Sequence, residues 1–90
     1  MAQDHETDAL RAELGREPLR LATLAARTWK LAGLVERDVT DRLRRRIERE
    51  LQLRFGELQA MTPDQLRRTR AWCTELALEL RAGRTPLWIT

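Results

Sequence analysis

Residues 62–83, TPDQLRRTRAWCTELALELRAG, carry the clearest structural signal of this chain. Thr62 is a favourable helix N-cap, Pro63 suits the first helical position because it has no N–H to leave unbonded, and Gln65 completes a capping box with Thr62. Gly83 marks the end, since glycine readily adopts the left-handed conformation that follows a helix. Between these signals, apolar or small residues recur at the spacing of one helix face: Leu66, Thr69, Cys73, Leu76, Ala77 and Leu80. The stretch therefore predicts a helix over 63–82.

Two further apolar stripes with helical spacing precede this helix. The nearer one predicts a helix over 38–60, for which Asp38 or Thr40 can act as the N-cap. Its members are Leu43, Ile47, Leu51, Phe55, Leu58 and Met61. The other predicts a helix over 18–33 that begins with Pro18 at its first position. Its members are Leu21, Leu24, Ala25, Thr28, Leu31, Ala32 and Val35.

The centres of these two stripes lie about 130° apart around a continuous helix. One straight helix cannot bury both, so we expect a chain break between Gly33 and Asp38. The alternative is a single long helix with two exposed faces that it shares with a partner.

The domain organisation that follows has three parts. Residues 1–17 form a flexible N-terminal segment, residues 18–83 a helical bundle domain, and residues 84–90 an apolar tail. Within the first segment a short helix ended by Gly15 could form. Its residues would be Ala9, Leu10, Glu13 and Leu14.

The composition supports an all-α fold. The 90 residues are 42% hydrophobic and 34% charged and include only four glycines and three prolines, and no period-two alternation is sustained. We expect a small antiparallel bundle of three main helices, completed by homodimerisation. No apolar run approaches the roughly 20 residues that a bilayer span requires.

The titratable residues offer no catalytic constellation. The chain has one histidine, His5, and one cysteine, Cys73, which together make neither a disulfide nor an ordinary structural zinc site. Cys73 falls on an apolar stripe and is expected to be a buried small hydrophobe. We therefore expect no enzyme, metal, cofactor or small-molecule substrate. The acidic and polar N-terminus lacks the pattern of a secretory signal, which indicates a cytoplasmic protein.

The strongest local charge feature is an arginine-rich segment over 42–49. Seventeen Lys and Arg residues against fourteen Asp and Glu give a net charge of +3. Helical projection places four arginines on one face, the basic ridge, and two more lie in the first turns of the helix over 63–82, where cations oppose the helix dipole. The six are Arg42, Arg45, Arg46, Arg49, Arg67 and Arg68. They predict a DNA- or RNA-binding regulator as the alternative function. Glutamates threaded through the same region weaken that field and favour an ordinary solvated surface.

Several apolar residues fall outside the buried stripes. Leu53 and Leu78 project away from the predicted core faces, and the chain ends in an apolar segment. That tail either folds back over the bundle or inserts into a partner, for which tryptophan is a typical anchor. The predicted function is a non-catalytic interaction or regulatory module that binds itself or another protein. The candidate contact residues are Leu53, Leu78, Leu87, Trp88 and Ile89. Trp29 and Trp72 are expected at the core or its edge.

Overall fold

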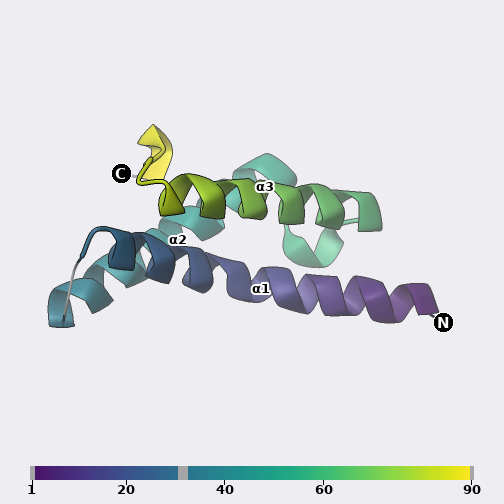
Figure 1. The fold of residues 1–90 in the computed structure, drawn as a ribbon. Helices are drawn as coiled ribbons and strands as arrows, with labels where there is room; N and C mark the ends of the chain where they lie inside the picture. Colours follow the sequence, from purple (N-terminus) through teal and green to yellow (C-terminus); the bar gives the residue numbers. More distant parts are fainter. Residues whose placement is uncertain (1, 31–32, 90) are drawn as a thin grey trace.

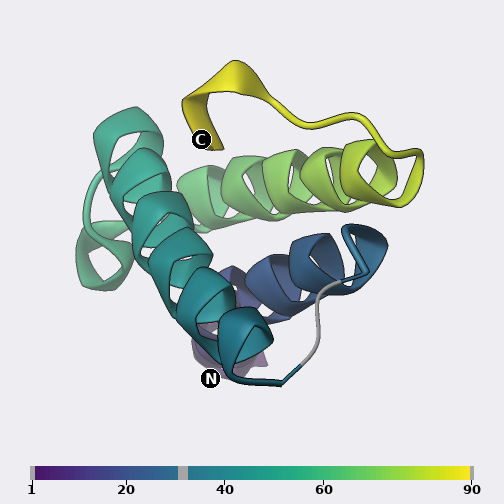
Figure 2. The same ribbon diagram turned by 90° about the vertical axis from the view of Figure 1, so that its left-hand side faces the viewer.

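The computed structural model describes residues 2–30 and 33–89, and these residues form helices and turns without any strand. The three α-helices are α1 (Ala2–Thr28), α2 (Gly33–Phe55) and α3 (Pro63–Arg81), and two short 3-10 helices are η1 (Leu58–Ala60) and η2 (Leu87–Ile89). α1 and α3 run in the same general direction, and α2 runs back across both (Figures 1 and 2). The expectation of an all-α fold with three main helices is confirmed.

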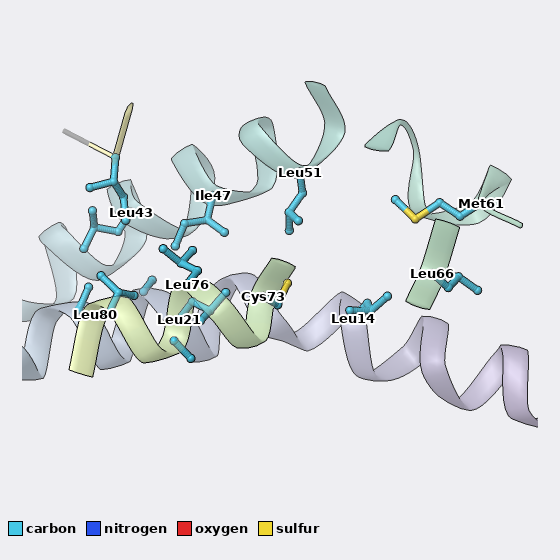
Figure 3. Packing of buried hydrophobic residues seen from close by; sticks show 14 residues of the cluster. Leu14, Leu21, Leu43, Ile47, Leu51, Met61, Leu66, Cys73, Leu76 and Leu80 are labelled. Atoms are coloured by element: carbon cyan, nitrogen blue, oxygen red, sulfur yellow. The ribbon is translucent and has the colours of Figure 1, made fainter. Parts of the chain in front are cut away.

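The core forms where all three helices face one another. α1 packs extensively against both α2 and α3, whereas α2 and α3 contact each other little. Leu21 from α1, Ile47 from α2 and Leu80 from α3 are almost fully buried. Their side chains point into the same interhelical space (Figure 3). Burial of these aliphatic groups, at about 1.5–3 kcal/mol each, is the main force that holds the helices together.

The start of α3 follows the predicted capping chemistry. The Gln65 backbone N–H donates to the Thr62 hydroxyl oxygen at 3.3 Å, and the Thr62 N–H donates to Gln65 Oε1 at 2.8 Å. Gly83 follows the helix with φ of 79°. All six residues of the predicted apolar stripe are buried. This helix was predictable because short-range signals fix both its ends.

The predicted start of the first main helix at Pro18 is wrong. Pro18 does not begin a helix but lies inside α1, which runs without interruption from residue 2 to residue 28. Proline removes one backbone hydrogen bond and crowds the preceding turn, at a cost of about 3 kcal/mol. The turns on both sides are nevertheless held by tertiary contacts, because Leu14 and Leu21 are both buried in the core. Gly15 is likewise interior to α1, so residues 2–17, where a flexible segment with a short separate helix was expected, are part of this one helix.

The break between the first two helices lies earlier than predicted. α1 ends at Thr28, and the next turn contains Lys30 with φ of 58°. A left-handed backbone at lysine is uncommon, so residue preferences did not indicate it. The stripe residues Leu31 and Ala32 lie outside the described part of the chain.

The start of α2 changes accordingly. Gly33 has φ of 68° and begins the helix, so neither Asp38 nor Thr40 is an N-cap. Residues 34–40 are helical, which corrects the expected turn in this segment. Val35 therefore belongs to α2 and is 58% exposed, although it was predicted to be on the buried stripe of the preceding helix.

The other end of α2 is also shorter than predicted. The helix stops at Phe55, followed by Gly56 with φ of 84°, and η1 occupies residues 58–60. This change of direction lets Met61 be buried although it lies beyond the helix. An open cavity of about 270 Å³ remains beside this connection, with Leu14, Leu51 and Leu58 among its lining residues.

Candidate interaction surface

The C-terminal tail folds back onto its own bundle. Ile89 is only 3% exposed and joins the core. The indole ring of Trp88 lies 5.5 Å from that of Trp72, and Phe55 meets the other side of this cluster edge-on at 6.1 Å from Trp72. The Arg54 guanidinium lies 5.5 Å from the Trp72 ring centroid, within the range of a cation–π contact. Figure 2 shows the tail returning over α3 toward α2.

One hydrogen bond fastens this tail to α2. Arg46 Nε donates to the backbone carbonyl oxygen of Trp88 at 2.6 Å. The tail thus contacts both α2 and α3, which barely touch each other directly. The sequence left two positions open for the tail, folded back over the bundle or inserted into a partner. In the structure it is folded back. This corrects the candidate contact set, because Ile89 is buried within its own chain and Trp88 packs on Trp72.

Three of the predicted contact residues are on the outside of the molecule. Leu53 is 70% exposed, Leu78 57% and Leu87 94%. They do not make one patch. Leu53 is on α2, whereas Leu78 follows Trp72 by six residues and so projects about 120° around α3 from the tail-binding side.

The exposed side of α2 carries a second pattern, which we call the outer stripe and define as Val35, Arg42, Arg49 and Leu53. All four are exposed, and they lie on the side of the helix opposite the buried face. Within the described residues, neither Arg42 nor Arg49 forms an ion pair. Sequence reasoning found the arginines and Leu53 but assigned Val35 to another helix. A break placed at residue 30 rather than after Gly33 would have revealed the complete stripe.

The remaining arginines of the basic ridge have partners inside the chain. Arg45 forms an ion pair with Asp41 at 2.9 Å, and Arg46 holds the tail. Asp41 also accepts a hydrogen bond from Arg44 at 2.8 Å, and this bond, with the positive charge nearby, lowers the pKa of the Asp41 carboxyl. Two of the four arginines of the basic ridge therefore already have partners within the chain.

The two α3 arginines are not part of this ridge. Arg67 pairs with Asp64 at 2.5 Å and lines an open groove of about 760 Å³ between α1 and α3, together with Glu6 and Glu13. Arg68 is exposed and, among the described residues, forms no ion pair. The six arginines proposed for phosphate contact are thus distributed over separate surfaces.

The groups with potential chemical reactivity are set apart from one another. Cys73 is fully buried, and this desolvation, together with the negative charge of Glu17, raises the pKa of its thiol to about 12. His5 is exposed near the start of α1. Among residues 2–30 and 33–89, no three His, Cys, Asp or Glu side chains are grouped as a metal site would require.

Among the side chains that the structure describes, Glu17 carries the only buried carboxylate. It forms an ion pair with Arg20, whose Nη2 donates to Glu17 Oε1 at 3.1 Å. This pair raises the pKa of the Arg20 guanidinium, chiefly through the hydrogen bond. The carboxylate is satisfied within α1, so the arrangement is that of a structural ion pair.

Comparisons with known proteins identify no relative. No family model, curated protein or solved structure matches this chain. None of the described helices combines the length and the apolar character needed to cross a lipid bilayer. Functional inference therefore depends on the molecule's own surface.

Proposed function

We propose that this protein is a non-catalytic helical module that binds proteins, itself included, through apolar side chains on the outside of its helices. The observation that carries the proposal is the exposure of Leu53, Leu78 and Leu87 after the tail has already folded onto the bundle. Single exposed leucines are common in any protein. Here, however, large aliphatic groups remain on α2, α3 and the tail of a chain with only 90 residues.

Self-association is best supported at the outer face of α3. Leu78 is flanked there by the exposed small residues Ala71 and Ala82, which lie on the same side of the helix and allow a second helix to approach closely. Exposed residues of both signs, Glu75 and Arg81, border the face. Two copies related by a twofold axis can therefore meet there without facing a single sign of charge. We further propose a cytoplasmic location, where an unpaired cysteine such as Cys73 stays reduced.

The test is the oligomeric state across concentration, measured by sedimentation equilibrium. We expect a reversible dimer that Leu78→Glu converts to monomer. Leu53→Glu is the matched control, because it places the same charge at another exposed leucine, on a different helix, and we expect it to leave the dimer intact. A wild-type chain that stays monomeric at millimolar concentration contradicts self-association. Equal effects of both substitutions contradict the assignment to α3.

Nucleic-acid binding is the second candidate. It is favoured by three exposed arginines without ion-pair partners among the described residues, namely Arg42, Arg49 and Arg68. Counterion release predicts that such binding weakens steeply as salt rises. Titration of a fluorescent 20-base-pair duplex and a single-stranded oligonucleotide at low salt tests it. Absence of binding, or binding that survives Arg42→Glu with Arg49→Glu, rejects this candidate.

A further inference from the structure

The exposed face of α2 has the spacing with which one helix meets another. Between Val35 and Leu53 lie two half-buried neighbours, Val39, which packs against the core on one side, and Arg46. The complete series is Val35, Val39, Arg42, Arg46, Arg49 and Leu53. Its intervals are four, three, four, three and four residues, as in the contact seam of a coiled coil. With a rise of 1.5 Å per residue, the series extends over about 27 Å, or five helical turns.

The charge distribution along this series is uneven. Both ends are aliphatic, and the middle is occupied by arginines. Arg46 donates to the tail, whereas Arg42 and Arg49 form no ion pair within the described residues. Asp38 is an exposed acid one turn before Arg42, and no ion pair joins the two. The centre of the stripe is therefore a positive surface with unused hydrogen-bond donors.

A second copy of the same stripe does not complement this surface. If two α2 helices met antiparallel about the middle of the series, Arg42 would face Arg46 of the other copy. If they met parallel, each arginine would face its own equivalent. Both arrangements bring like charges together, which disfavours association. The occupant of the outer stripe is thus chemically different from the stripe itself.

We propose that the outer stripe binds an amphipathic helix of another protein, with acidic residues at the centre of its contact face and aliphatic residues at both ends. This inference rests on the proposed protein-binding function and names the partner chemistry of one surface. Arg42 and Arg49 pair with the acidic centre, and Val35 and Leu53 pack against the two ends. The tail lies beside α2, because Arg46 donates to the Trp88 carbonyl.

The aliphatic ends distinguish this partner from a nucleic acid. A phosphate backbone would satisfy Arg42 and Arg49, but it would leave Val35 and Leu53 uncovered. Phosphate contact also requires no alternation of three and four residues along the helix. A partner helix accounts for the arginines, the exposed aliphatic groups and their spacing together.

The probe is a synthetic helical peptide of about 20 residues, with leucines at both ends of one face and glutamates at its centre, labelled for fluorescence anisotropy. We expect Arg42→Glu with Arg49→Glu to weaken binding at least tenfold. The control, Arg16→Glu with Arg27→Glu, makes the same charge change at exposed arginines of α1 and should alter affinity less than twofold. We expect Leu53→Ala to weaken binding several-fold and Asp38→Asn to tighten it. Circular dichroism confirms that each variant is folded.

Besides failure of the wild type to bind the peptide, two results overturn the inference. One is an equal loss in both double variants, which shows binding to net charge rather than to the stripe. The other is tighter binding of a 20-base-pair duplex than of the peptide, with dependence on Arg42 and Arg49, which assigns the stripe to nucleic acid. The monomeric Leu78→Glu variant should bind the peptide as the wild type does. If the wild type dimerises through α3 but does not bind the peptide, only the proposed partner chemistry is rejected. If it binds the peptide but forms no dimer, only self-association is rejected.

Discussion

The two faces of α2 have opposite roles although they belong to one helix. Leu43, Ile47 and Leu51 on the inner face are buried against α1, α3 and the tail. On the outer face, Val35 and Leu53 are as aliphatic as the inner residues but stay in solvent. Residue type therefore does not decide which side is buried. The inner face stabilises the fold, and the outer face is free to be selected for binding.

The largest expected difference between the faces is in stability. Ile47→Ala should lower the free energy of unfolding by about 2–5 kcal/mol, because it removes a fully buried side chain and leaves a cavity. Leu53→Ala removes a similar aliphatic group from solvent and should change stability by less than about 0.5 kcal/mol. Urea denaturation monitored by circular dichroism measures both. Similar losses for the two variants would show that Leu53 is covered in solution.

Measurements of stability at alkaline pH test the burial of Cys73, which lies in the same core cluster as the inner-face residues of α2. Its thiol pKa rises from 9.0 to about 12 on burial. Above pH 9 the unfolded chain loses this proton and the folded chain keeps it, so stability should fall as pH rises from 9 to 12. The slope for one group is about 1.4 kcal/mol per pH unit. Thermal unfolding across this range should show the slope in wild type.

The same measurement on Cys73→Ala is the control, since that variant retains every other titrating group. The chain has no tyrosine, which leaves few other groups that titrate there. An unchanged slope in Cys73→Ala would show that the thiol is accessible in the folded protein. Slow reaction of native Cys73 with a thiol reagent would agree with its burial.

The predictable parts of the fold depend on chemistry that is close in sequence. Thr62 and Gln65 are three residues apart and cap each other, and the periodic apolar residues of α3 are all buried. Pro18 and Lys30 were not predictable in this way. The helix continues through Pro18 because residues on both sides pack against distant segments, and the turn at Lys30 has a backbone conformation that lysine seldom adopts.

The candidate site shows the same division. Helical projection correctly placed Leu53 and Leu78 outside the core, because projection needs only local geometry. The role of Arg46 could not be predicted, since it bonds a backbone carbonyl 42 residues away. Val35 was misassigned once the break between the helices had been placed too late.

Arg46 lies between the inner and outer faces of α2, and its substitution tests how much its bond to the tail stabilises the protein. Arg46→Ala removes a charged donor from the Trp88 carbonyl and should destabilise the protein by about 1–2 kcal/mol. Arg45→Ala is the matched control, because its ion pair with Asp41 is exposed to solvent and should contribute little to stability. Denaturant titration compares the two. Equal effects would mean that this bond does not hold the tail in solution.

A smaller stabilising effect is expected at Gly15 of α1, which lines the same cavity as Leu51. A Cβ atom at Gly15 would lie 3.7 Å from Leu58 Cδ2, an ordinary contact distance. Gly15→Ala should therefore stabilise the protein by about 0.5–1 kcal/mol, through higher helix propensity and a less flexible unfolded chain. Differential scanning calorimetry measures this as a higher Tm. A lower Tm would show that α1 and η1 are already in tight contact.

The neighbouring indole rings of Trp72 and Trp88 provide an intrinsic spectroscopic signal. With ring centroids 5.5 Å apart and planes inclined by 31°, the two indoles are close enough for their excited states to couple. Such coupling produces a pair of bands of opposite sign in far-ultraviolet circular dichroism, which vanishes when the rings separate. Binding of a partner that displaces the C-terminus would therefore change the circular dichroism signal without any added label. Binding that leaves the C-terminus in place would not change it.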